Sequence, residues 1–161
     1  MRRSSSNRTA VILDRPGVWP KRLDHLAIDF NGTLAKDGAL LPGVAVRLRR
    51  LARRMRVTVL TADTFGTARW SLRSLPVTVR TCRTGAQKRQ FVRARERHVV
   101  AIGNGRNDLE MFKEAVLAIA VIGPEGAVPG VFRSVTIIVS DVRDALNLLL
   151  RPLRLTATLR E

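Results

Sequence analysis

The sequence contains a single cysteine, Cys82, among 161 residues. An internal disulfide is therefore excluded, and this usage is typical of the reducing cytoplasm, where we expect the protein to reside. We expect Cys82 to be a buried strand residue rather than a reactive thiol. No apolar run of about 18 residues occurs, and no charged leader precedes an apolar stretch and a small-residue cleavage site. These absences predict a protein without a membrane span or a secretory signal.

Aromatic side chains are also scarce, with two Trp, five Phe and no Tyr. The chain therefore offers no stacking platform for single-stranded nucleic acid. It shows no helix-turn-helix, zinc or RNA-module signature. A Walker-type phosphate loop is excluded because no GxxxxGKS or GxxxxGKT pattern is present.

Acidic residues are few, 13 against 29 basic ones, so the formal net charge is +16. Such a charge favours anionic partners, among them phosphates, nucleic acid and membrane surfaces. Only four basic residues are Lys and the other 25 are Arg, a ratio that a codon preference also explains. The charge therefore does not identify one partner, and nucleic acid remains a minor alternative.

Short apolar strands alternate with amphipathic helices along most of the chain. We expect strands at Ala10–Leu13, Leu23–Asp29, Arg56–Leu60, Pro76–Thr81, Val99–Ile102, Ala115–Ile122 and Ser134–Val139. We expect helices at Gly43–Met55, 64–75, Thr84–Arg97, after Asp108, and at Asp141–Leu150. This alternation predicts an α/β fold, a Rossmann-like doubly wound parallel sheet flanked by helices.

The ends of the chain differ from its centre. Residues 1–9 are polar and basic and are expected to be disordered, residues 10–150 to form one α/β domain, and residues 151–161 to form a basic tail. The sequence leaves open whether this tail is extended or helical. Within 43–55, an apolar stripe is flanked by Arg47, Arg50, Arg53 and Arg54, which favours a solvated helix face over a nucleic-acid patch.

The stretch Leu26–Lys36 is the centre of the prediction. Its apolar run ends in a lone carboxylate, Asp29, and the chain then turns through Asn31-Gly32. A buried strand followed by a glycine turn places an acid at the carboxyl edge of a sheet, where ligands of open α/β folds bind. The alternative is a hairpin turn in which Asp29 is a solvated strand end.

Two further strand ends carry polar groups, Thr61 with Asp63 and Asn104 with Asp108, and the helix between them contains Lys88. Carboxyl ends of neighbouring parallel strands converge on one crevice. Carboxylate and amide oxygens suit Mg²⁺, which binds through one or two carboxylates, waters and substrate phosphate. The pattern therefore predicts a Mg²⁺-assisted site for a phosphoryl group with a carboxylate available for attack.

These pieces resemble the haloacid dehalogenase-like phosphohydrolase superfamily, in the order of its four motifs. DFNGTL at Asp29–Leu34 is similar to the first motif, Thr61 to the second, Lys88 to the third and GNGRND at Gly103–Asp108 to the fourth. The segments TADTFGTA, AIGNGRND and RLTATLR further resemble a soluble branch related to the phosphorylation domain of P-type ATPases.

The resemblance implies a role for each matched residue. Asp29 would attack phosphorus and, with the backbone carbonyl of Asn31 and the pair Asn104 and Asp108, would bind Mg²⁺. Thr61, the amide of Ala62 and Lys88 would hold phosphoryl oxygens, and Lys88 would favour ionised Asp29. The phosphate-binding set that the resemblance implies is Gly32, Thr61, Ala62, Lys88 and Asn107. For single residues the alternatives are a surface base at Lys88, a plain strand-end hydroxyl at Thr61 and a helix cap at Asp63.

Two departures from the motifs bear on activity. Active phosphatases of the superfamily usually carry Asp at the position of Asn31, and an anionic metal ligand is expected at Asn104. A neutral amide at position 31 can neither protonate a leaving group nor activate water. We therefore expect a slow Mg²⁺-dependent phosphohydrolase acting on a phosphorylated partner, or a binding protein that keeps a degenerate phosphate and Mg²⁺ site. No room for a cap domain is expected between the motifs, so the crevice is open or is closed by another subunit.

Overall fold

A computed structural model of the chain describes residues 11–15, 18–63, 66–95 and 98–160. The disorder predicted for residues 1–9 lies outside these ranges. No helix in the described ranges has both the length and the apolar character needed to cross a membrane.

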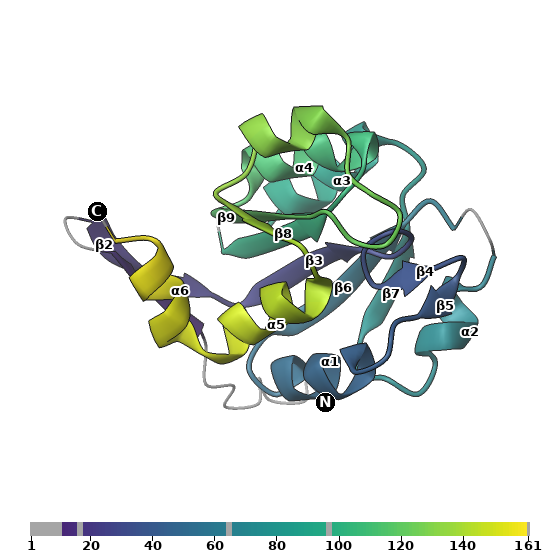
Figure 1. Cartoon of the computed structure of the whole chain (residues 1–161), viewed down its shortest axis with the longest axis horizontal. Helices are drawn as coiled ribbons and strands as arrows, with labels where there is room; N and C mark the ends of the chain where they lie inside the picture. Colours follow the sequence, from purple (N-terminus) through teal and green to yellow (C-terminus); the bar gives the residue numbers. More distant parts are fainter. Residues whose placement is uncertain (1–10, 16–17, 64–65, 96–97, 161) are drawn as a thin grey trace, which may run out of the picture.

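A parallel sheet of six strands forms the centre of the described structure (Figure 1). Its strands, in their spatial order, are β10 (Ile137–Val139), β9 (Leu117–Val121), β8 (Val99–Gly103), β3 (His25–Asp29), β6 (Arg56–Thr61) and β7 (Thr78–Thr81). All residues of β3, β8 and β9 are buried, because a parallel sheet is covered on both faces and its inner strands are apolar throughout. The predicted doubly wound parallel sheet is confirmed.

Helices cover both faces of this sheet (Figure 1). On one face, α1 (Val44–Ala52) and α5 (Val142–Leu150) pack over one apolar cluster. On the other, α3 (Gly85–Arg93) and α4 (Leu109–Glu114) pack over a second cluster. The short helix α2 (Ala68–Leu72) lies between β6 and β7 in the chain.

The structure differs from the sequence prediction at both ends of the chain. β1 (Val11–Arg15) and β2 (Val18–Leu23) form a separate antiparallel hairpin, so the predicted strand 23–29 is divided between β2 and β3. The tail is largely helical: α6 (Pro152–Thr158) begins with Pro152 in its first turn, where the missing N–H costs nothing, and buries Leu155. Leu155 joins the core cluster that includes hairpin residues Val11 and Leu23.

Smaller differences from the prediction concern a hairpin, two 3₁₀ segments and the lengths of two helices. A hairpin of β4 (Ala35–Lys36) and β5 (Ala39–Leu40) follows the first motif and was not predicted. The 3₁₀ segment η1 (Arg106–Asp108) directly precedes α4, and the 3₁₀ segment η2 (Pro129–Arg133) follows the loop after β9. The predicted helices 64–75 and 84–97 are shorter, since α2 spans only 68–72 and α3 ends at 93.

The arginine-rich face of α1, predicted to be solvated, is only partly exposed to solvent. Arg47 donates to Asn147 Oδ1 at 3.0 Å, and Arg54 donates to the carbonyl of Leu150 at 3.1 Å. These two arginines therefore tie α1 to the end of α5. Arg50 and Arg53 remain exposed.

Candidate active site

Asp29 is the last residue of β3, in the middle of the sheet. Only 6% of its surface is exposed, so the alternative of a solvated strand end is wrong. Behind it the chain folds back tightly, with the amides of Thr33, Leu34 and Ala35 all donating to the carbonyl of Phe30. The first motif therefore forms a compact loop that keeps the carboxylate at the carboxyl edge of the sheet.

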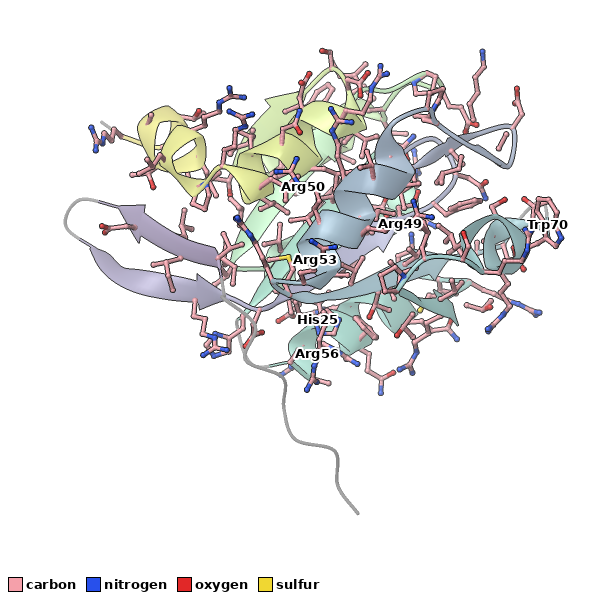
Figure 2. All side chains as sticks on the ribbon, turned by 90° about the horizontal axis from the view of Figure 1, so that it is seen from below. His25, Arg49, Arg50, Arg53, Arg56 and Trp70 are labelled. Carbon is pink, nitrogen blue, oxygen red and sulfur yellow. The ribbon has the colours of Figure 1, made fainter. Side chains whose placement is uncertain are left out.

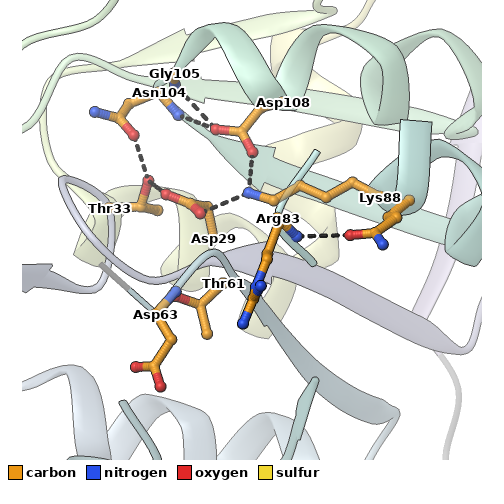
Figure 3. A network of polar contacts seen from close by, with 10 residues as sticks. Asp29, Thr33, Thr61, Asp63, Arg83, Lys88, Asn104, Gly105 and Asp108 are labelled. Atoms are coloured by element: carbon orange, nitrogen blue, oxygen red, sulfur yellow. Dashed lines mark hydrogen bonds and ion pairs between the residues drawn. The ribbon is translucent and has the colours of Figure 1, made fainter. Parts of the chain in front are cut away.

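Lys88 reaches this carboxylate from α3 (Figure 3). Its Nζ lies 2.7 Å from Asp29 Oδ1 and 2.7 Å from Asp108 Oδ1, and its side chain is fully buried. The alternative of a surface base is therefore wrong for Lys88. One buried ammonium between two buried carboxylates leaves a net negative charge that favours a bound cation.

Both carboxylate oxygens of Asp108 accept hydrogen bonds. Oδ2 accepts hydrogen bonds from the amides of Asn104 and Gly105, at 3.0 and 2.9 Å, and Oδ1 is the atom that accepts from Lys88. Its carboxylate thus closes the fourth-motif loop and orients Lys88. The role of Asp108 as a direct metal ligand stays a prediction.

Thr33 joins the first and fourth motifs. Its hydroxyl lies 3.2 Å from Asn104 Oδ1 and 3.5 Å from Asp29 Oδ2, and a single hydroxyl proton serves one of these acceptors at a time. Sequence reasoning missed Thr33 as a site residue, although it follows Gly32 within the quoted motif. Its contacts bring two candidate metal-binding oxygens around one hydroxyl.

Gly32 is required by close packing as well as by its backbone. Its φ is +76°, and a Cβ at this position would lie 2.4 Å from Asn104 Nδ2. That amide in turn donates to the carbonyl of Gly126 at 2.8 Å. Whether Gly32 contacts phosphate stays a prediction; the structure shows that it allows the first and fourth motifs to meet.

Thr61 ends β6 beside Asp29 in the sheet order and is buried. Its Oγ1 accepts from the amide of Asp63 at 2.9 Å, which leaves the hydroxyl proton available to an anion. The carboxylate of Asp63 points away from Asp29 (Figure 3) and accepts from the amide of Ala68, the first residue of α2, at 3.4 Å. This contact supports the helix-cap alternative for Asp63. The neighbouring Ala62 is half-buried at the same strand end.

Asn31 and Asn107 are both half-buried. Oδ1 of Asn31 is buried and accepts no hydrogen bond from the described residues. Buried side-chain oxygens almost always have a donor, so this atom is suited to a group that enters the crevice. Asn107 lies within η1, beside the amides that hold Asp108, and its phosphate role stays a prediction.

The pKa of Asp29 is raised, although its neighbour Lys88 was expected to favour the ionised form. Burial and the negative charge of Asp108 raise it from 3.8 to about 7, and the opposing effect of Lys88 is smaller. Lys88 does favour the ionised carboxylate, but the loss of hydration outweighs one ammonium. Metal-free Asp29 is therefore a carboxyl group that ionises only near neutral pH.

This shift predicts a stability effect for Asp29→Asn in metal-free protein. The folded pKa lies above the unfolded one, so ionised Asp29 reduces stability above about pH 7, and this cost disappears as the pH falls toward the unfolded pKa. Calorimetry in EDTA should therefore show a Tm higher than wild type by roughly 5 °C at about pH 8, with a smaller difference at about pH 5. Asp24→Asn, an exposed carboxylate before β3, is the control. Equal differences at both pH values would contradict the prediction.

The donor atoms fit Mg²⁺. No cluster of three His, Cys, Asp or Glu suited to a metal occurs among the described residues, yet Mg²⁺ needs only one or two carboxylates and otherwise keeps water or phosphate oxygens. Asp29 supplies one carboxylate, and Asn104 Oδ1 lies on the other side of the Thr33 hydroxyl. With the backbone carbonyl of Asn31, these oxygens can hold such an ion.

No protein-family model matches the sequence. The cobalt-bound deoxy-D-mannose-octulosonate 8-phosphate phosphatase of Haemophilus influenzae superposes with a TM-score of 0.66 at 14% identity, covering 85% of this chain and 92% of that one. The 3-deoxy-D-manno-octulosonate 8-phosphate phosphatase of Moraxella catarrhalis, in complex with magnesium, phosphate and KDO, gives 0.64 at 17% identity over 80% and 86% of the two chains.

The chain has the haloacid dehalogenase fold. A phosphoserine phosphatase in its apo form also superposes, with a TM-score of 0.64 at 14% identity over 78% of this chain and 98% of that one. At these identities the likeness establishes the fold of the chain. The resemblance read from the four motifs is thereby confirmed at the level of the haloacid dehalogenase fold.

One curated relative is similar in sequence. A stretch of 63 residues is 51% identical to the uncharacterized protein MJ0073 of Methanocaldococcus jannaschii, covering 39% of this chain and 68% of that protein. The two belong to the same family. Because MJ0073 is uncharacterized, the similarity to it assigns no activity to this chain.

Proposed function

We propose that this chain is a phosphohydrolase that acts through an aspartyl-phosphate at Asp29 and turns over slowly. The observation that carries the proposal is the buried arrangement of Asp29, Lys88 and Asp108 at the carboxyl edge of β3, with 2.7 Å contacts from Nζ to both acids. A buried acid facing an ammonium, beside a free strand-end hydroxyl, provides a nucleophile and an anion cradle together.

The first half-reaction forms the aspartyl-phosphate. A carboxylate oxygen of Asp29 attacks the phosphorus of a phosphate monoester, the P–O bond to the leaving group breaks, and the leaving oxygen takes a proton from solvent. Thr61 Oγ1 and the amide of Ala62 donate to phosphoryl oxygens, while Lys88 neutralises part of their charge. Bound through Asp29, Asn31 and Asn104, Mg²⁺ would supply further neutralisation and would favour ionised Asp29.

The second half-reaction restores Asp29. Water attacks phosphorus, the bond to the Asp29 oxygen breaks, and inorganic phosphate leaves with the proton balance completed by solvent. Position 31 is two residues beyond Asp29 in the sequence, but its amide neither gives nor takes a proton at neutral pH. Both steps therefore lack general acid–base assistance, which accounts for slow turnover.

The proposal is tested by Mg²⁺-dependent hydrolysis of p-nitrophenyl phosphate. Wild type should release phosphate slowly, and Asp29→Asn should reduce the rate to that of a protein-free control, because the nucleophile is removed. The matched control is Asp24→Asn, which removes an exposed carboxylate just before the other end of β3 and should leave the rate unchanged. An Asp29→Asn variant with the wild-type rate would exclude an aspartyl-phosphate.

A binding protein with a degenerate phosphate and Mg²⁺ site is the second candidate. It is favoured by two neutral residues, Asn31 and Asn104, where relatives with this motif usually carry acids. The site would then hold phosphate and metal without turnover. Calorimetric binding of phosphate in the presence of Mg²⁺, without hydrolysis by wild type, would support this candidate over the enzyme.

A further inference from the structure

A second hollow, with a volume of about 390 Å³, lies apart from the crevice at Asp29. We call it the arginine groove, after the three arginines in its lining, Arg56, Arg80 and Arg95. His25 and Arg56 are partners in the sheet and both line this groove (Figure 2). Arg49 and Arg50 belong to α1 and do not line it.

The arginine groove lies toward the opposite edge of the sheet from Asp29. His25 is the first residue of β3, Arg56 the first of β6 and Thr78 the first of β7, and all three line the groove. Asp29 is four residues further along β3, or about 13 Å at the rise of an extended strand. A ligand in the groove is therefore separate from the site at Asp29.

None of the described residues that line the groove is acidic. Within the described ranges, none of the three arginines forms an ion pair with a carboxylate. The guanidinium carbon of Arg95 lies 3.4 Å from the ring centroid of Phe91, and that of Arg80 lies 5.4 Å from it. Burial and the charges of Arg80 and Arg56 lower the pKa of Arg95, so the cluster carries a repulsion that an anion would relieve.

Arg95 is held in place by its contacts with Phe91. Arg95 donates to the backbone carbonyl of Phe91 at 2.6 Å as well as stacking on the ring. His25 packs edge-on against the same ring, with centroids 5.5 Å apart, and is hydrogen-bonded to Thr58 at 2.9 Å. Guanidinium groups that are already positioned lose less conformational entropy on binding a ligand.

We propose that the arginine groove is a second anion site, which binds the phosphate group of a small phosphorylated molecule. Guanidinium groups match phosphate oxygens in a bidentate way, and the volume is within the range of small-molecule sites. The groove also offers the hydroxyl of the exposed Thr78 as a donor. This inference does not depend on the proposed reaction at Asp29.

The test is a titration of the full chain with pyrophosphate in EDTA, followed by amide NMR, for which its 17.9 kDa mass is suitable. Shifts should concentrate in β7 and at the end of α3. The double variant Arg56→Gln/Arg80→Gln should weaken binding at least about tenfold, as expected for the loss of charge-assisted hydrogen bonds. The matched control, Arg49→Gln/Arg50→Gln, removes the same charge from the exposed face of α1 and should change Kd less than about twofold.

Four outcomes would overturn the proposal. Equal weakening by both double variants would show a general attraction to positive charge. Shifts confined to the loops around Asp29 and Asn104 would place the anion in the catalytic crevice. Tighter binding of a 5′-phosphorylated single-stranded oligonucleotide than of pyrophosphate, lost equally in both double variants, would indicate an extended nucleic-acid surface. Absence of any pyrophosphate binding would also exclude the site.

Discussion

Asn31→Asp is expected to raise the Mg²⁺-dependent hydrolysis of phosphate monoesters by about 10²-fold or more, the usual scale of general acid–base catalysis. The substitution keeps the shape of the side chain and supplies a group that can donate and accept a proton. The buried Oδ1 of Asn31 accepts no hydrogen bond from the described residues, so the substitution breaks no hydrogen bond to this atom within that part of the chain.

The choice of substrate separates the two roles of the new carboxylate. An alkyl phosphate has a poor leaving group, so its release gains most from a general acid. With p-nitrophenyl phosphate the leaving group needs little protonation, so any gain reports mainly on activation of water in the second half-reaction. Rapid-quench measurement of phosphorylated protein, with acetyl phosphate as the donor, would show which step has been accelerated.

The control is the double variant Asp29→Asn/Asn31→Asp, which should be inactive because it lacks the nucleophile. If Asn31→Asp is no faster than a wild type that is active through Asp29, the amide at position 31 is not what limits turnover. If wild type and Asn31→Asp are both silent while phosphate still binds with Mg²⁺, the binding-protein candidate is supported.

Lys88→Met should lower the free energy of unfolding by about 3–5 kcal/mol, measured in urea at about pH 8 without metal. Its fully buried ammonium contacts Asp29 and Asp108 at 2.7 Å each. A methionine of similar length leaves two buried carboxylates facing each other with no cation between them. The loss should shrink as the pH falls through about 7, because burial raises the pKa of Asp29 to about 7 and the protonated acid no longer needs a cation beside it.

Two further variants make this prediction specific. Lys88→Met/Asp29→Asn should be more stable than Lys88→Met, because only one buried carboxylate then remains without its cation. Lys113→Met removes an exposed lysine that pairs with Glu110 on α4 and should leave stability nearly unchanged. A loss at Lys88 no larger than that at Lys113 would mean that the ion-pair cluster does not hold the site together.

The alternation of strands and helices was predictable because it depends on local pattern. Strands of a parallel sheet are buried on both faces, so β3, β8 and β9 appear as continuous apolar runs, while the helices show their 3.6-residue periodicity. The antiparallel hairpin of β1 and β2 was not predicted. Its strands are stabilised by α6, more than 100 residues later in the chain, and no local signal connects the two.

The motif residues were predictable for a similar reason. Asp29 and Thr61 follow apolar runs directly, and carboxyl ends of adjacent parallel strands meet at one edge. Cys82 was correctly expected to be buried, although it lies just beyond β7. The roles of Asp63 and Asp108 required the structure, because they depend on which amides and ammonium groups lie within hydrogen-bonding distance.

The sequence by itself determined the fold class and the position of the candidate site, because periodicity and strand ends depend on neighbours in the chain. The tertiary structure decided the charge state of Asp29, the use of both oxygens of Asp108, and the grouping of Arg56, Arg80 and Arg95 in one groove. These properties depend on burial and on distances between segments that are far apart in sequence. Burial removes hydration from a charge, and only the packed chain fixes how much is lost and which partner replaces it.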